Sequence, residues 1–290
     1  MIIGIDLGGT KIAGILTSPS GNIIMDVQIP TEARKGKQQV LKNIIKAIHM
    51  LINSRKASIR AIGIGAPGPI LYENGIVIDA PNLPGWKRVN LKQILEKKFL
   101  VPVFVDNDAN CAALAEARFG AGKNARHFIY LTVSTGVGGG IIIDRKLYRG
   151  ITGSAGEFGH MLVDPNGPLC GCGKHGCLEA IASGSALRKR TGLDALALEL
   201  AARQGDKEAK KAISEMAHFI AIGVANLVNI FNPELVVIGG GLSNMRELLL
   251  TPIKDEYKKY ALALPARSVK IVRAKLGSKA GVLGAAALCL

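Results

Sequence analysis

Residues 127–150 read HFIYLTVSTGVGGGIIIDRKLYRG and contain the stretch that decides the fold. Residues 127–133 predict a strand, because β-branched and aromatic residues dominate this short run. Residues 134–140 form a loop of glycine and hydroxyl residues that leads directly into a second apolar run. A Rossmann or P-loop fingerprint opens a helix, whereas this loop opens a strand. No GxxxxGK(S/T) motif occurs either, because Gly122-Lys123 is followed by Asn124 and lacks the leading glycine.

A similar strand-turn-strand element stands at the start of the chain. The runs at residues 2–7, 11–18 and 22–29 predict three short strands separated by GGT and SPSG. In the first turn, the bare backbone of Gly8-Gly9 can approach phosphate, and Thr10 and Lys11 add a hydroxyl and a charge. Asp6 at the strand end favours a phosphate site over an ordinary turn, since an acid there can hold hydrated magnesium.

A third polar cluster follows the strand at residues 101–105. Asp106, Asn107 and Asp108 stand between this strand and the helix predicted at residues 111–119. Open α/β sheets place their ligand chemistry beyond the carboxyl ends of strands. Asp108 alone could be a helix N-cap, but three crowded polar groups exceed what capping requires.

Three further loops are candidates for substrate contacts. Gly65–Pro69 and Asn82–Trp86 could line a sugar pocket, in which Asn82 would donate and accept hydrogen bonds. Gly239–Gly241 would let a flat adenine ring lie on bare backbone. The alternatives are plain turns for the first two loops and a packing cluster for the third.

Residues 156–179 read GEFGHMLVDPNGPLCGCGKHGCLE and predict a metal site. Cys170, Cys172 and Cys177 are separated by glycines that let the backbone fold tightly, and His160 is the natural fourth ligand. Three thiolates favour a closed, structural zinc site over a catalytic one with an open position. Buried or redox-active cysteines with a core histidine are the alternative. The metal would hold a knuckle that positions the flanking acids, Glu157 and Glu179.

The run GEFGH followed by CxCGxxGCxE resembles the signature of the ROK family of sugar kinases and repressors, and among its members the ATP-dependent glucokinases are most similar. The resemblance covers nearly the whole chain. It implies an actin-like ATPase, hexokinase-type (ribonuclease H-like) α/β fold, duplicated in two domains with a central cleft. It also implies ATP and Mg²⁺ as well as structural Zn²⁺.

The resemblance assigns roles to the candidate residues. Asp108 matches the catalytic base. The sugar would contact Gly65, Asn82, Asn107, Glu157, His160 and Glu179. ATP would contact Asp6, Gly8, Gly9, Thr10, Lys11, Thr135, Gly136, Gly138, Gly139, Gly240 and Gly241. Zinc would be bound by His160, Cys170, Cys172 and Cys177. One nitrogen of His160 would bind zinc while the other faces the sugar.

The expected substrate is glucose, phosphorylated at its 6-hydroxyl. A kinase of N-acetylmannosamine or N-acetylglucosamine is the alternative within the class. A sugar-responsive repressor is the alternative from another class; it would need a helix-turn-helix before the first strand, where this chain has one residue.

Composition limits the partners. The chain has 290 residues, 48% of them hydrophobic, and a net charge of +15. Its basic residues are scattered and its aromatic content is 4%, which argues against nucleic acid. The apolar stretch Phe219–Phe231 is judged too short and polar for a membrane span. Five cysteines without a disulfide framework, and a start that looks like a strand rather than a signal peptide, favour the cytoplasm. Sugar and nucleotide are the expected ligands, and a homo-oligomer (dimer or tetramer) the expected assembly.

The smaller domain is expected to comprise residues 1–115 with the C-terminal helix 280–290, and the larger one residues 116–279 with the knuckle at 160–177. Apolar periodicity predicts further helices and strands. The helices are 38–54, 91–99, 195–203, 209–231, 246–260 and 280–290, and the strands are 60–64, 234–241 and 269–273.

Overall fold

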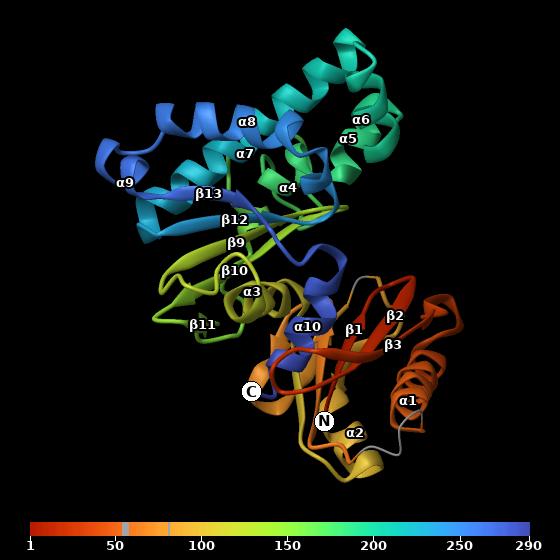
Figure 1. Cartoon of the computed structure of the whole chain (residues 1–290). Coiled ribbons are helices and arrows are strands. Elements are labelled where there is room, and N and C mark those ends of the chain that lie inside the picture. The colour runs from red at the N-terminus through yellow and green to blue at the C-terminus, as the bar shows by residue number, and fades with distance from the viewer. Residues whose placement is uncertain (54–57, 81) are drawn as a thin grey trace. The chain divides into compact units, whose positions relative to one another are not determined.

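The computed structural model describes residues 1–53, 58–80 and 82–290, which form two compact units. The first unit comprises Met1–Gly120, Leu147–Ala155 and Ser278–Leu290, and the second comprises Ala121–Lys146 and Gly156–Gly277 (Figure 1). The C-terminal segment therefore packs with the N-terminal unit. Residues 147–155 also belong to the first unit, although the sequence analysis assigned them to the larger domain.

A five-stranded sheet forms the centre of the first unit. Its strand order is β3-β2-β1-β4-β8. The strands are β1 (Ile2–Leu7), β2 (Lys11–Thr17), β3 (Ile23–Pro30), β4 (Ala61–Ala66) and β8 (Val103–Asn107). The pairs β1/β2 and β2/β3 are antiparallel, whereas β1/β4 and β4/β8 are parallel. Because β4 and β8 run parallel, their carboxyl ends meet at one edge of the sheet.

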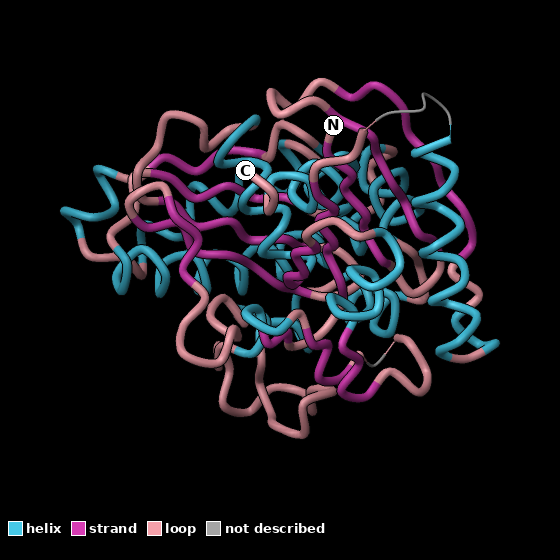
Figure 2. The backbone as a smooth tube through the Cα atoms, turned by 90° about the horizontal axis from the view of Figure 1, so that it is seen from below, coloured by secondary structure: helices cyan, strands magenta, loops and turns pink. Residues whose placement is uncertain are grey.

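Helices cover both faces of this sheet. The first, α1 (Lys37–Asn53), packs against β2 and β3. Figure 2 shows the helices and strands of the chain from below. The opposite face is covered by α10 (Ala280–Ala287), which contacts β1, β4 and α3 (Asp108–Phe119). This contact is very close: a Cβ on Gly63 of β4 would lie 1.8 Å from the carbonyl oxygen of Ala285. Only a glycine lets the last helix approach the sheet at this point.

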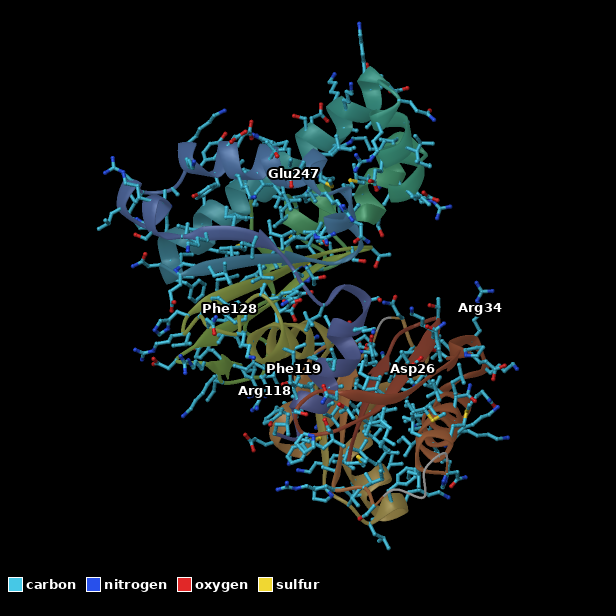
Figure 3. All side chains as sticks on the ribbon, viewed as in Figure 1. Asp26, Arg34, Arg118, Phe119, Phe128 and Glu247 are labelled. Carbon is cyan, nitrogen blue, oxygen red and sulfur yellow. The ribbon has the colours of Figure 1, made fainter. Side chains whose placement is uncertain are left out.

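A small antiparallel sheet completes the first unit. It consists of β5 (Ile70–Leu71), β6 (Ile76–Asp79) and β7 (Lys87–Asn90), followed by α2 (Leu91–Phe99). Trp86, just before β7, is 1% exposed and belongs to the core of this unit. Charged side chains such as Asp26 and Arg34 lie on the outside of the unit (Figure 3).

A second five-stranded sheet, most of whose strands lie in the second unit, repeats the first. Its strand order is β11-β10-β9-β12-β13, with β9/β10 antiparallel and β9/β12 and β12/β13 parallel. The strands are β9 (Phe128–Val133), β10 (Val137–Ile143), β11 (Lys146–Tyr148), β12 (Leu235–Gly239) and β13 (Lys270–Arg273). Ile2 and Phe128 stand at equivalent register positions, since they pair in parallel with the first residues of β4 and β12. By the same register, Asp6 corresponds to Thr132 and Gly65 to Gly239.

Helices make up most of the rest of the second unit. They are α4 (Leu178–Ala182), α5 (Gly184–Thr191), α6 (Ala195–Arg203), α7 (Lys207–Phe231), α8 (Glu247–Glu256) and α9 (Ala263–Ser268). By length and composition, α7 alone among the described helices could cross a membrane, and 56% of its most apolar window is buried inside the protein. It packs against α4, α6 and α8. We therefore regard α7 as a core helix, and the apolar stretch Phe219–Phe231 is its C-terminal part.

Short 3-10 helices occupy several connections. They are η1 (Ala33–Lys35), η2 (Tyr72–Asn74), η3 (Phe158–His160), η4 (Gly241–Met245), η5 (Tyr257–Lys259) and η6 (Gly277–Lys279).

Most predicted elements are confirmed, with three corrections. Gly138, Gly139 and Gly140 lie inside β10, so the second turn is shorter than predicted. The helix predicted at 246–260 divides into α8 and η5. The helix α9 was not predicted, because it contains Pro265; this proline lies in the first turn, where its missing N–H is tolerated. The predicted end of the first long helix at Ser54 lies outside the described residues.

Candidate active site and metal centre

The turn between β1 and β2 is closed by hydrogen bonds at both groups of the Gly8 backbone. The amide of Gly8 donates to the carbonyl of Lys11 at 3.0 Å, and the Thr31 hydroxyl donates to the Gly8 carbonyl at 2.6 Å. Asn82 packs against Gly9, whose added Cβ would lie 3.1 Å from the Asn82 Cβ. The structure therefore brings one predicted sugar ligand next to the predicted phosphate turn.

Asp6 is the last residue but one of β1, and its carboxylate has an unfavourable environment. Burial raises the pKa of Asp6 above its ordinary value, and the charge of Lys11 lowers it only in part. The first turn of α10 approaches closely: a Cβ on Gly281 would lie 2.4 Å from Asp6 Oδ2. A divalent cation bound to this carboxylate would neutralise its buried negative charge. The residues present therefore fit magnesium.

The carboxyl end of β8 holds the candidate base. Asn107 is the N-cap of α3, because its side-chain oxygen accepts from the amides of Ala109 at 2.8 Å and Asn110 at 3.4 Å. Asp108 is the first residue of α3, and its carboxylate also accepts from the Ala109 amide, at 2.8 Å. Gly65, at the end of β4, lies beneath it, with its added Cβ 3.7 Å from the Asp108 Cα. Asp108 is thus not needed as the cap, which leaves a catalytic role open to it.

An ion pair that the sequence analysis missed supports this strand end. Arg149 Nε donates to Asp106 Oδ2 at 2.8 Å, and its guanidinium lies over the Tyr72 ring, 3.6 Å from the centroid. Asp106 Oδ1 accepts from the Asn107 amide at 2.8 Å and from Asn110 Nδ2 at 3.0 Å. Asp106 is 1% exposed. Its carboxylate therefore ties Arg149 to the turn that carries Asp108.

The turn between β9 and β10 is held by the segment that follows the cysteines. The amide of Ser134 donates to the Gly136 carbonyl at 2.8 Å, which closes the turn. The amides of Gly184 and Ser185 donate to the carbonyls of Ser134 and Thr135, at 2.7 and 3.1 Å. The carbonyls of Ser134, Thr135 and Gly136 and the amide of Ser134 are therefore all engaged within the second unit, which fixes the backbone of the turn.

Two predicted nucleotide residues lie beside this turn. Gly240 has a φ of 82°, and a Cβ there would lie 2.3 Å from the Val133 carbonyl oxygen and 2.7 Å from Thr132 Oγ1. A Cβ on Gly241 would lie 3.6 Å from Ser134 Oγ. The end of β12 is therefore a glycine surface directly beside the turn. By contrast, Gly138 and Gly139 lie in β10, and Gly139 packs against the Phe158 ring.

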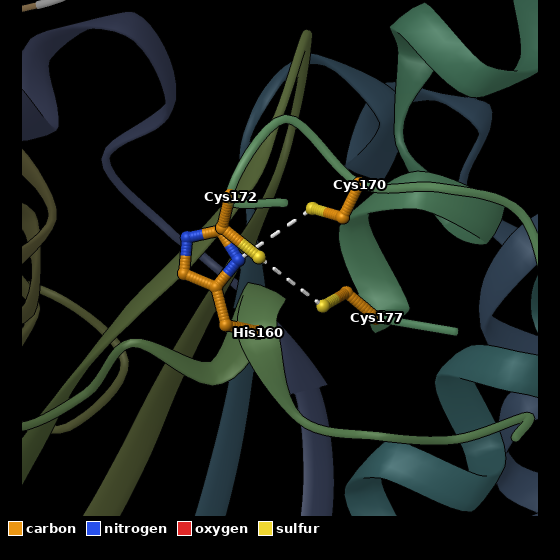
Figure 4. Close-up of side chains that lie close together, drawn as sticks. All are labelled: His160, Cys170, Cys172 and Cys177. Carbon is orange, nitrogen blue, oxygen red and sulfur yellow. Dashed lines mark hydrogen bonds between the residues drawn. The ribbon is translucent and has the colours of Figure 1, made fainter. Parts of the chain in front are cut away.

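The four predicted metal ligands converge on one point. The ligand atoms of His160, Cys170, Cys172 and Cys177 lie within 4.8 Å of one another (Figure 4). Cys172 Sγ is 3.6 Å from Cys177 Sγ, and Cys170 Sγ is 3.7 Å from His160 Nδ1. A tetrahedral zinc with Zn–S bonds of about 2.3 Å places neighbouring sulfurs roughly 3.8 Å apart, so the donor set fits zinc.

The protonation of the thiols depends on their burial and on any bound cation. Burial, followed by the hydrogen bond with Cys172, raises the pKa of the Cys177 thiol to about 12. A bound zinc would reverse this shift, because coordinating thiols lose their protons. His160 presents Nδ1 to the sulfurs, and its Nε2 lies 4.0 Å from Glu157 Oε2. The metal-facing nitrogen is therefore Nδ1, and Nε2 points toward the predicted sugar acid.

The structure gathers the predicted residues into two sets, one in each unit. The first unit holds Asp6, Gly8, Gly9, Thr10, Lys11, Gly65, Asn82, Asn107 and Asp108. The second holds Thr135, Gly136, Gly138, Gly139, Glu157, His160, Cys170, Cys172, Cys177, Glu179, Gly240 and Gly241.

Two sheets with the same strand order and register, each with a glycine turn at the same place, define the duplicated, actin-like class of α/β proteins to which hexokinases belong. The chain belongs to the ROK family, whose model matches residues 2–290. It is 39% identical to a glucokinase of Thermotoga maritima, with 99% of this chain and 96% of the relative covered. A ROK glucokinase from Streptomyces griseus, solved in complex with glucose and AMPPNP, matches with a TM-score of 0.86 at 37% identity, over 99% and 98% of the two chains. A xylose repressor of Caldicellulosiruptor bescii is 37% identical and is covered over 78% of its length, compared with all of this chain.

Proposed function

We propose that this chain is an ATP-dependent glucokinase, which transfers the γ-phosphoryl group of ATP to the 6-hydroxyl of glucose. The observation that carries the proposal is the position of Asp108, which stands at the carboxyl end of β8 although Asn107 already caps α3. The likeness to glucokinases over nearly their full length supports the same conclusion. A repressor needs no base at this point, so Asp108 favours the kinase over the repressor relatives.

The proposed reaction is an in-line displacement. The 6-hydroxyl oxygen of the sugar forms a bond to the γ-phosphorus while the bond to the β-phosphate oxygen breaks, and ADP leaves. The hydroxyl proton passes to the Asp108 carboxylate. Because such transition states are loose, positioning and charge neutralisation contribute more than basicity.

Each unit supplies part of the binding machinery. In the first, the Gly8–Lys11 turn would contact the phosphates, and Asp6 would hold Mg²⁺, which neutralises phosphate charge when bound. In the second, the 134–137 turn and Gly240-Gly241 would contact the nucleotide. Sugar hydroxyls would be bound by Asn82, Asn107, Gly65, Glu157, His160 and Glu179.

The sugar preference follows from the chemistry of these ligands. A carboxylate can accept two hydroxyl protons, so Glu157 and Glu179 suit a row of equatorial hydroxyls. A sugar that lacks one of these hydroxyls leaves an acceptor unpaired. This should cost about 1 to 3 kcal/mol of transition-state stabilisation, and kcat/KM should fall accordingly.

We further propose structural zinc at the His160–Cys177 knuckle, a cytoplasmic location, and a homo-oligomer. Oligomeric state is measured by light scattering on the purified protein.

We expect no binding of nucleic acid, because the basic residues are scattered along the sequence and do not form one basic block.

A coupled assay of ADP release tests the proposed function. Specificity constants are measured for glucose, mannose, fructose, N-acetylglucosamine and N-acetylmannosamine. We expect glucose to rank first. If an acetylated sugar outranks glucose, the sugar assignment falls and the kinase assignment survives; if no sugar gives turnover above the Asp108→Ala background, the kinase assignment falls and the repressor class is favoured.

A further inference from the structure

The carboxylate of Glu179 makes a contact that sugar binding does not require. The backbone amide of Val137, the first residue of β10, donates to Glu179 Oε2 at 2.9 Å. Val137 closes the turn that we assign to the nucleotide. The other carboxylate oxygen has no part in this hydrogen bond and can accept from a sugar hydroxyl. One side chain therefore has the means to bind a sugar and to hold the nucleotide turn.

The fit around this carboxylate is tight. A Cβ on Gly136 would lie 2.4 Å from Glu179 Oε2, and Gly136 has no positive φ that would otherwise call for glycine. On the other side, a Cβ on Gly159 would lie 2.1 Å from the Val137 carbonyl oxygen and 3.3 Å from the Glu179 Cβ. Glu179 therefore packs closely against the turn on one side and against the η3 segment, next to Glu157 and His160, on the other.

The backbone reinforces this arrangement. The residues after Glu179 donate two hydrogen bonds to the turn, from Gly184 to Ser134 and from Ser185 to Thr135. The Ser183 amide in turn donates to the Glu179 carbonyl at 3.3 Å. A displacement of Glu179 is therefore transmitted to Ser134, Thr135 and Val137, and all of these contacts lie within the second unit.

We propose that Glu179 is a positioning residue for the nucleotide turn as well as a sugar ligand, so that sugar and nucleotide binding are coupled through its carboxylate. This inference rests on the proposed function. A sugar hydroxyl on the free oxygen fixes the carboxylate in the orientation that orders Val137, and an ordered turn holds the carboxylate ready for the sugar. Because coupling between binding sites is reciprocal, each ligand should raise the affinity for the other by the same factor, about 5-fold or more.

The test measures the binding of AMPPNP with Mg²⁺ by calorimetry in the absence of any sugar. A residue that only binds sugar cannot affect this measurement. We expect Glu179→Ala to weaken AMPPNP binding at least about 5-fold. The reason is that the variant loses the carboxylate that accepts a hydrogen bond from the Val137 amide. Glu179→Gln should retain most of the affinity, since its amide oxygen can accept from Val137. Unchanged AMPPNP affinity in Glu179→Ala would overturn the inference.

Glu234→Ala is the matched control in the same unit. Glu234 Oε1 also accepts from backbone amides, those of Arg126 at 2.8 Å and His127 at 3.0 Å, but at the opposite end of β9. This variant loses the same kind of contact without touching the turn, so its AMPPNP affinity should equal that of the wild type. An equal loss in both variants would mean general destabilisation and would overturn the positioning role.

A reciprocal variant covers the case in which Glu179→Ala does not fold. Gly136→Ala places a methyl group against the carboxylate, and we expect it to weaken glucose binding about 5-fold without nucleotide present. Unchanged glucose affinity in Gly136→Ala would overturn the inference. If wild-type protein binds AMPPNP but the variants behave as the wild type, only the coupling fails; if wild-type protein binds neither ligand, the proposed function fails as well.

Discussion

The two sheets share strand order and register but not the chemistry at their turns. At equivalent positions, the first sheet carries Asp6 and the second carries Thr132. The first turn thus has an acid within its own strand, and burial raises the pKa of that acid. The second turn has none, and its carboxylate, Glu179, comes from the segment after the cysteines.

This difference shows that two copies of one fold can obtain their charged groups from different segments. A topology repeats because strand pairing and helix packing repeat, whereas a charged group must be placed separately in each copy. The first unit has its acids, Asp6 and Asp108, on strands of the sheet or directly after them. In the second unit the acid, Glu179, lies in α4, directly after the cysteine segment for which we propose zinc. We therefore expect activity to depend on single carboxylates in the first unit, which carries the proposed base, and on zinc in the second.

The largest effect should come from the acid at the end of β8. We expect Asp108→Ala to lower kcat at least about 100-fold while the binding of glucose and AMPPNP stays within a few-fold, because a general base acts on the proton in flight. Steady-state kinetics and calorimetry give the two numbers. Asn107→Ala should instead raise KM for glucose. If Asp108→Ala unfolds the protein, with no separate effect on rate, its role is structural.

The next effect concerns the second unit. Elemental analysis should find one zinc per chain, and Cys172→Ala should lose the metal, melt at a lower temperature and bind glucose more weakly, because the knuckle then no longer holds Glu157 and Glu179. Cys289→Ala in the first unit is the control and should keep its zinc. Wild-type protein without zinc, whose three knuckle cysteines alkylate freely, would refute the site.

A smaller effect tests the burial of Asp6. Its raised pKa means that folding favours the protonated acid, so the stability it contributes is present below its ordinary pKa and is lost as the pH rises through the raised value. Asp6→Asn removes this penalty. Without ligands, the variant should therefore melt above the wild type at neutral pH, and the difference should shrink toward pH 4. Its activity should nevertheless fall. Asp26→Asn, at an exposed position of β3 (Figure 3), is the control for the same chemical change at the surface and should melt close to the wild type at neutral pH.

The smallest effects compare ion pairs in the two units. Arg149→Met leaves the buried Asp106 carboxylate unpaired and should destabilise the first unit by about 3 kcal/mol. Arg126→Met breaks the pair with Asp144 in the second unit, whose side chains are 64% and 59% exposed, and should change stability by less than about 1 kcal/mol. Urea unfolding measures both. Equal losses would mean that burial does not distinguish these pairs.

The sequence allowed the chemistry of short segments to be predicted, but not contacts between distant ones. The cysteine knuckle could be predicted because its ligands lie within 18 residues, from His160 to Cys177, and only a few geometries satisfy such spacing. Asp6 and the glycine turn were likewise visible as a local pattern. The Arg149–Asp106 pair was not, since its partners are 43 residues apart and meet only because residues 147–155 return to the first unit. The glycines of β10 were misplaced because glycine propensity favours a loop, whereas packing against Phe158 and strand pairing with β9 determine their structure.

The close packing of α10 on β1 and β4 has a consequence for protein synthesis. The ribosome makes β1 before the second unit, but it makes the helix that covers one face of β1 only after that unit. The second unit is fully translated by Gly277, before α10 exists, so we expect it to acquire its core first. The unit that is begun first is then completed second, because its sheet stays uncovered on one face until α10 is translated, which reverses the N-terminal-first order usual for multidomain chains.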